Sequence, residues 1–244
     1  MNFSAFDPSE YRQAITKAVA ALDSRLQETR REPDIRILQA ISQFMESVDH
    51  MERLDAETGK GDVAVASEVT RVGNQSLQLL DQISAAAAAQ GMSDSVLQLQ
   101  RLSLPVAFWI AQHQGYIECL ELIVNAFSGL ANQIDDPALL VVLCEAMAKV
   151  QSVVSNRVRQ TSQIGGLVDP WRILNLNWGI VATRTHNTAL MEEVFGQLVS
   201  NIPQDARGFF QEGMQQMDIV GYPDEVRQVM EKYSGLWGSE SRLH

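Results

Sequence analysis

The sequence has few cysteines and lacks the patterns that mark β-structure or membrane helices. Two of its 244 residues are cysteines, Cys119 and Cys144, and both lie in apolar segments with helical spacing. Two cysteines permit one disulfide, but buried reduced thiols fit these segments better. No stretch approaches the roughly 18 apolar residues of a membrane-spanning helix. Asn-Gly and Asp-Gly turns and alternating apolar runs are also missing, which argues against a β-rich fold.

Positive charge is scarce as well. Nineteen Lys and Arg residues face 30 Asp and Glu residues, which gives a net charge of −11 and a pI near 4.8. Nucleic acids and anionic membranes attract basic surfaces, so we expect neither as a partner. The first residues, MNFSAFDPSEY, lack the charged and apolar regions of a secretory signal. These features predict a cytoplasmic protein.

Motifs that name a reaction are missing too. The sequence has no phosphate-binding glycine loop, no nucleophile elbow, no H-E-x-x-H, no C-x-x-C and no Glu-x-x-His pair. Glu46 and His50 share one helical face, but two ligands do not complete a metal site, so we interpret them as a solvated surface. His113, near a helix end, is assigned a structural role. We therefore expect no metal and no cofactor, and an enzyme would need a site assembled from distant segments.

Helical signals run through the whole chain. Asp-Pro pairs at residues 7–8, 136–137 and 169–170 place a capping residue before a proline suited to a first helical position. Apolar residues then recur every three or four positions, as expected for one buried helical stripe. Residues 93–134 are expected to break or bend at Pro105 and Gly115, and one helix is expected from Pro137 almost to Gly165-Gly166. The pattern predicts an all-α fold of ten or eleven helices.

The arrangement of these helices has two interpretations. Either they stack as an irregular antiparallel array, or they pack as a multi-helix bundle. GYIECLELIVNAF resembles the second helix of a tetratricopeptide unit and YPDEVRQVM resembles a HEAT helix, although no period of about 34 or 40 residues is kept. Gly165-Gly166 is the predicted boundary between an N-terminal body, 1–164, and a C-terminal four-helix unit, 167–244. One continuous domain is the alternative.

Residues 146–191 carry a net charge of +4 in an otherwise acidic chain. On a helical wheel, residues 170–186 have two apolar sides and between them a polar stripe: Arg172, Asn175, Gly179, Thr183 and His186. In the favoured interpretation, the stripe and Arg184 form ion pairs and hydrogen bonds within the protein, since buried polar groups usually have hydrogen-bond partners. In the sharper hypothesis the stripe, Arg184, Arg157 and Arg159 bind an acidic peptide or an anion.

The C-terminal quarter is rich in aromatic and thioether side chains. Such residues at helical spacing usually form core, although a partly exposed set would suit a partner helix. The residues are Phe209, Phe210, Met214, Met217, Tyr222, Tyr233 and Trp237. We expect them to be mainly core.

The sequence favours a non-enzymatic protein-interaction module, an adaptor, scaffold or assembly chaperone, whose partner is another protein; an acidic segment of that partner is one option. The alternative is a helical ligand-binding protein or enzyme that holds an anionic small molecule near Arg172 and Arg184. A self-associating homo-oligomer is a third hypothesis.

Overall fold

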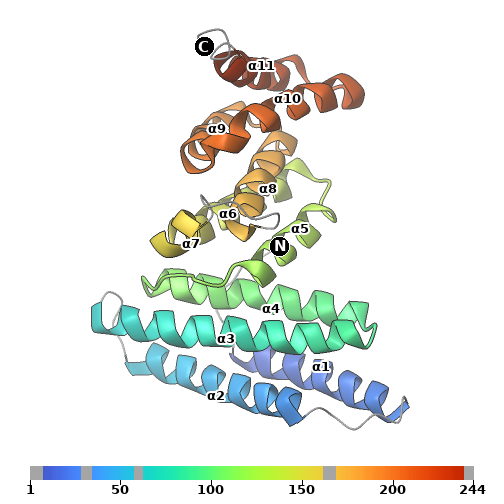
Figure 1. Ribbon diagram of the computed structural model, residues 1–244, viewed down its shortest axis with the longest axis vertical. Coiled ribbons are helices and arrows are strands. Elements are labelled where there is room, and N and C mark those ends of the chain that lie inside the picture. Colours follow the sequence, from blue (N-terminus) through green and yellow to red (C-terminus); the bar gives the residue numbers. More distant parts are fainter. Residues whose placement is uncertain (1–7, 29–34, 58–62, 162–168, 239–244) are drawn as a thin grey trace. The chain divides into compact units, whose positions relative to one another are not determined.

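The computed structural model describes residues 8–28, 35–57, 63–161 and 169–238. These residues form eleven α-helices and no β-strand, which confirms the predicted all-α fold (Figure 1). None of the helices described is long and apolar enough to cross a membrane. The helices are α1 (Pro8–Glu28), α2 (Ile35–Glu57), α3 (Val63–Ala89), α4 (Ser93–Gln112), α5 (Glu121–Ala131), α6 (Pro137–Ser152), α7 (Asn156–Thr161), α8 (Pro170–Arg184), α9 (Thr188–Asn201), α10 (Pro203–Val220) and α11 (Asp224–Gly238).

The chain forms two compact units. The first holds the described residues up to Leu130 together with Lys149–Arg157, and the second holds Ala131–Ala148 and the described residues from Val158 onward. The boundary predicted at Gly165-Gly166 lies outside the described residues, as does the Asp7 cap. The proposed division into 1–164 and 167–244 stays a prediction.

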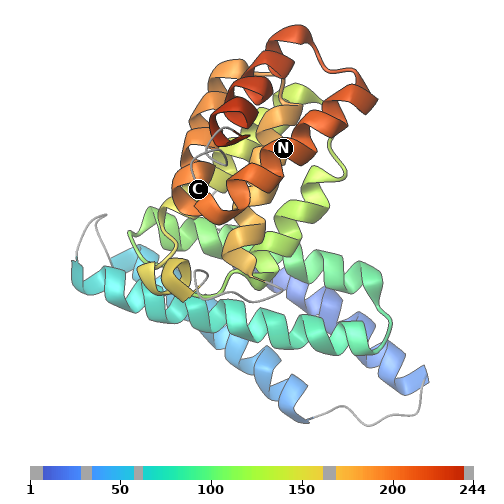
Figure 2. The ribbon, with the colours of Figure 1, turned by 45° about the horizontal axis from the view of Figure 1, so that its top comes forward.

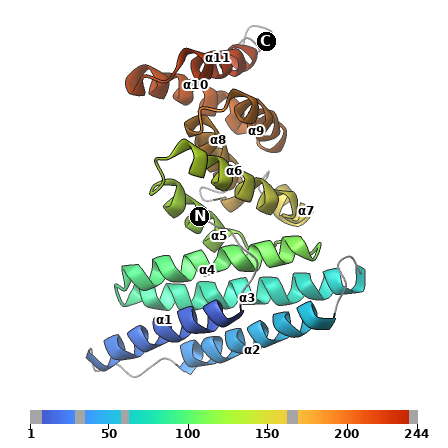
Figure 3. The same ribbon diagram turned by 180° about the vertical axis from the view of Figure 1, so that it is seen from behind.

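In the first unit, α1 to α4 form an antiparallel four-helix bundle. Helix α3 packs against α2 and α4, and α1 packs against the same two helices (Figures 1 and 3). Gly73 of α3 permits a close approach of α4, because a Cβ atom there would lie 2.4 Å from Ile110 Cγ1. The core follows the predicted helical spacing, with buried side chains at Ile15, Phe44, Val48, Met51, Val69, Val72 and Ile83.

Helix α4 continues through Pro105, so the chain does not break there. A proline inside a helix costs about 3 kcal/mol, because it removes a hydrogen bond and crowds the preceding turn. Here the next turn is fully packed, with Val106, Trp109 and Ile110 buried. Trp109 Nε1 also donates a hydrogen bond to Asp55 Oδ1 at 2.8 Å. Tertiary packing thus offsets the local preference.

The single helix expected from Pro137 to the glycine pair is wrong, because the chain interrupts it at Val153–Ser155 between α6 and α7. The interruption places Val154 beside Ile117 in a short parallel bridge. Ile117 N donates to Val153 O and Ser155 N donates to Ile117 O, both at 2.9 Å. The partner segment is extended because the chain leaves α4 just before Gly115, as the sequence predicted. A pairing between distant segments overrides the local helical pattern.

In the second unit, α8 to α11 follow one another as packed neighbours. Helix α9 contacts α8, α10 and α11, and α10 and α11 pack closely together (Figures 1 and 2). An aromatic cluster joins the last three helices. Phe195 of α9 lies edge-on to Phe210 of α10 and to Tyr233 of α11, with ring centroids 5.1 and 5.3 Å apart. Phe210 and Met217 are buried, whereas Phe209, Met214, Tyr222 and Tyr233 are half-buried; the side chain of Trp237 lies outside the described residues.

Candidate functional site

Helix α8 begins where its sequence predicts. The Asp169 carboxylate accepts hydrogen bonds from the backbone N–H groups of Trp171 and Arg172, at 3.0 and 3.4 Å, and Pro170 occupies the first helical position. This cap fixes the residue at which the helix begins. One apolar side is fully buried, as expected: Trp171, Leu174, Trp178, Val181 and Ala182.

The middle of the polar stripe of α8, Asn175, Gly179 and Thr183, is buried in the second unit. Asn175 is completely buried; its Nδ2 donates to Trp171 O at 2.8 Å and its Oδ1 accepts from Asn201 Nδ2 at 2.9 Å. Thr183 donates to Gly179 O at 2.9 Å. The second apolar side is not packed as the helical wheel predicted, since Ile180 on that side is 48% exposed. Short polar side chains can turn inward here because their own helix and α9 satisfy them.

Two of the predicted arginines of α8 bind groups within the same unit. Arg172 Nε lies 2.7 Å from Asp205 Oδ1 of α10. Arg184 donates to the carbonyl oxygens of Ala131 and Ile134, both at 2.6 Å, and lies 3.6 Å from Asp135. These contacts use guanidinium donors that a bound anion would require.

The remaining predicted site residues, Arg159, His186 and Arg157, do not share one environment. Arg159 lies over the ring of Trp171 with 5.0 Å to the centroid, and burial lowers the pKa of its guanidinium. His186 is exposed, has a left-handed backbone with φ of 55°, and meets Tyr222 edge-on at 5.4 Å. Arg157 is an exposed residue of α7. A partner- or anion-binding role for all eight residues stays a prediction.

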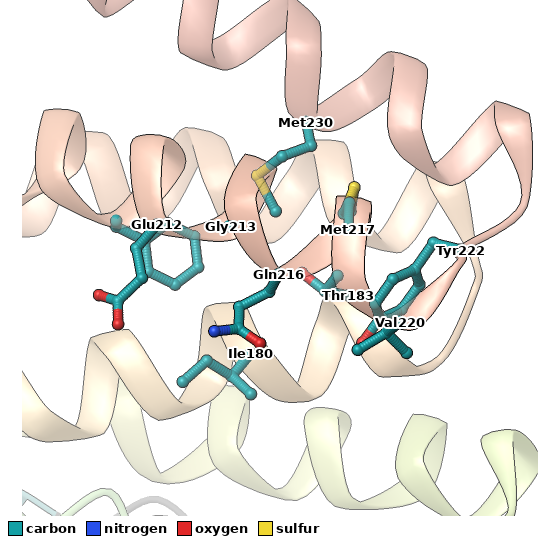
Figure 4. Close-up of a pocket in the computed structure, with 10 residues that line it drawn as sticks. Ile180, Thr183, Glu212, Gly213, Gln216, Met217, Val220, Tyr222 and Met230 are labelled. Carbon is teal, nitrogen blue, oxygen red and sulfur yellow. The ribbon is translucent and has the colours of Figure 1, made fainter.

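The structure contains a groove that the sequence did not predict. It has a volume of about 390 Å³ and lies between α8, α10 and α11. Figure 4 shows Ile180 of α8 facing Gln216 of α10, while Met230 of α11 extends toward Gly213. The lining is mostly apolar and contains two thioethers: Ile180, Thr183, Phe209, Glu212, Gly213, Gln216, Met217, Val220, Tyr222 and Met230. Thr183 is the residue that this groove shares with the predicted stripe. We call this feature the α10 groove.

Apolar side chains on the walls of the α10 groove are open to solvent. Ile180 is 48% exposed and Val220 is 63% exposed. The adjoining Ile219 is 77% exposed. Large apolar side chains gathered around a concavity are typical of a surface that another molecule covers.

A glycine on α10 shapes the floor of the groove. At Gly213 a Cβ atom would lie 2.7 Å from Met230 Cε and 2.8 Å from Met230 Sδ. The missing side chain therefore lets the thioether of α11 lie directly on the backbone of α10. The residues at 209, 213 and 217 are spaced by four, so they follow one row of the helix toward the groove. The sequence predicted Phe209 and Met217 to be core, and Met217 is buried while Phe209 is half-buried.

The chemistry of the groove suits binding. Among the described residues, Glu212 is the one carboxylate that lines it, and no histidine, cysteine or basic side chain does. Elsewhere, His50 Nε2 lies 3.4 Å from Glu68 Oε1, and His113 Nε2 lies 2.8 Å from Asp55 Oδ1. In the part of the chain that is described, no group of three or more His, Cys, Asp or Glu side chains could hold a metal ion. The groove offers apolar surface with a polar rim.

Compared with known proteins, the chain matches no family model, no curated protein and no solved structure.

Proposed function

We propose that this protein is a non-enzymatic interaction module that binds another protein through the α10 groove. The observation that carries the proposal is the combination of an apolar concavity with exposed apolar walls. An ordinary surface helix turns such side chains inward, yet Ile180 and Val220 face solvent beside a groove of about 390 Å³. Burial of these side chains against a partner would favour association.

The lining favours a protein partner. Thioether side chains are flexible and polarizable, so they adapt to apolar side chains of differing shape. Met217 and Met230 place such groups at the buried floor of the groove, and half-buried Phe209 adds an aromatic surface. Anchoring of a few large apolar residues in a central concavity is the usual source of protein–protein affinity. An adaptor, scaffold or assembly chaperone requires such a surface.

Peptide selection tests the proposal. The full chain is immobilised and panned against a library of displayed random peptides of about 16 residues, long enough for four helical turns. Selected peptides are expected to bind the Ile180→Asp variant roughly tenfold more weakly or worse, because the variant buries an unpaired carboxylate at the wall.

Leu236→Asp is the matched control, because Leu236 is an exposed apolar residue at 58% exposure that does not line the groove. It is expected to retain affinity. Failure to select any peptide, or equal binding by the Ile180→Asp chain, would overturn the proposal.

A further inference from the structure

The rim of the α10 groove changes in polarity along one row of α10. Glu212, Gln216 and Val220 are spaced by four residues and all line the groove. Eight residues of helix span about 12 Å, so a carboxylate stands two turns away from an exposed apolar residue. Tyr222 continues the apolar end. A molecule lying along this row meets an acidic end and an apolar end.

The acidic end is not neutralised. The Glu212 carboxylate has no hydrogen-bond or ion-pair partner among the described residues, whereas Arg227 is held by Asp218 and Glu231 and Lys232 by Glu192. Residues 169–238, which include the α8 wall of the groove, contain nine acidic and five basic residues, a net charge of −4. This field attracts cations and repels acidic segments.

The walls of the groove are helices, which affects the conformation of an occupant. Backbone groups inside a helix are already paired, so the walls offer no strand edge to an extended peptide. An extended segment would leave its own backbone groups unpaired against apolar side chains, at a cost in free energy. An α-helix satisfies its backbone internally and presents apolar residues at three- and four-residue spacing.

Resting on the proposed function, we infer that the α10 groove binds a basic amphipathic helix of a partner protein. Its apolar residues lie between Ile180, Met217 and Val220. A lysine or arginine about two turns away along that helix pairs with Glu212. The sequence instead suggested an acidic partner segment, which would compete for the same groove. The peptide with Glu in the test below represents that alternative.

The test uses the sequences selected on the full chain. Selected peptides are expected to combine helical apolar spacing with Lys or Arg about two turns from the apolar anchor. One such peptide is then synthesised with Lys, Gln or Glu at that position, and binding is measured by fluorescence anisotropy. The Lys peptide is expected to bind two- to fivefold more tightly than the Gln peptide, the range of an exposed ion pair, and the Glu peptide more weakly still.

Two variants test whether Glu212 causes the preference for the Lys peptide. Glu212→Gln is expected to abolish the preference for Lys, whereas Glu193→Gln, which removes the same charge from an exposed position of α9 outside the groove, is expected to keep it. Selected peptides without a basic residue, or equal binding of the Lys and Glu peptides, would overturn this inference. The proposed function of the groove would still hold if Ile180→Asp weakens binding of those peptides. Selection of no peptide at all would overturn both.

Discussion

Phe209 of α10 lies against Gly179 of α8, at a distance that leaves no room for a side chain. A Cβ atom on residue 179 would lie 2.5 Å from Phe209 Cζ and 2.9 Å from Leu198 Cδ1. The glycine therefore permits the contact between α8 and α10 that forms the wall of the α10 groove. In the sequence this glycine lies on the polar stripe considered as a binding site, and in the structure an aromatic ring of the same unit fills the space beside it.

Gly179→Ala is expected to lower the free energy of unfolding by about 1 kcal/mol. Overpacking costs roughly 1–3 kcal/mol, and the better helix propensity of alanine returns about 1 kcal/mol. Gly208→Ala is the matched control on α10, since nothing lies within 4 Å of its Cβ position. It is expected to stabilise by up to about 1 kcal/mol. Urea denaturation measures both, and equal effects of the two substitutions would contradict this account.

Asn175→Ala is expected to cost about 1–3 kcal/mol of stability, because it removes a buried acceptor from Asn201. Asn201→Ala is expected to cost a similar amount, since it removes the Asn201 donor from Asn175 Oδ1, which is completely buried and which water reaches only poorly. The double variant is expected to be less destabilised than the sum of the two by about 0.5 kcal/mol or more. A double-mutant cycle in urea measures this coupling. Strictly additive losses would show that the two side chains do not interact.

Asp81→Asn is expected to stabilise the protein at neutral pH. Partial desolvation of this surface carboxylate by its neighbours, and secondarily the charge of Glu121, raises the pKa of Asp81 above its ordinary value of 3.8. The folded chain thus binds this proton more tightly than the unfolded chain, so the ionised Asp81 lowers stability progressively as the pH rises above about 3.8. The gain from the amide is therefore expected at pH 7 and should vanish below pH 3.8, as followed by thermal unfolding across pH. A gain that persists undiminished at low pH would point to another cause.

Cys144 is expected to resist alkylation in the folded protein. Burial raises the pKa of its thiol to about 12, from an ordinary value of 9.0. Because the thiolate is the reactive form, labelling at pH 8 should be slowed by about a thousandfold before any loss of access is counted. Half-buried Cys119, whose pKa burial also raises, should label faster than Cys144 but more slowly than a free cysteine. Mass spectrometry with and without denaturant tests this, and equal rates for both thiols in the folded state would refute it.

Local signals in the sequence determined much of the fold. Asp136-Pro137 and Asp169-Pro170 place helix starts correctly, because a cap and a proline act through neighbouring backbone atoms. The buried side of α8 also follows directly from its spacing. The interruption between α6 and α7 did not, because it depends on pairing with Ile117, more than thirty residues away in the sequence.

The candidate site was decided by tertiary structure. The sequence identified α8 and the residues of its polar stripe. Whether that stripe faces the interior or solvent depends on which neighbouring groups form hydrogen bonds with it. Asn201 donates a hydrogen bond to Asn175, and carbonyl oxygens of α8 accept hydrogen bonds from Asn175 and Thr183, so these two polar side chains are buried. Ile180 faces solvent instead. Helical periodicity establishes which residues share a face. Whether that face is covered depends on helices that meet it from elsewhere in the chain, and here they leave an apolar groove open.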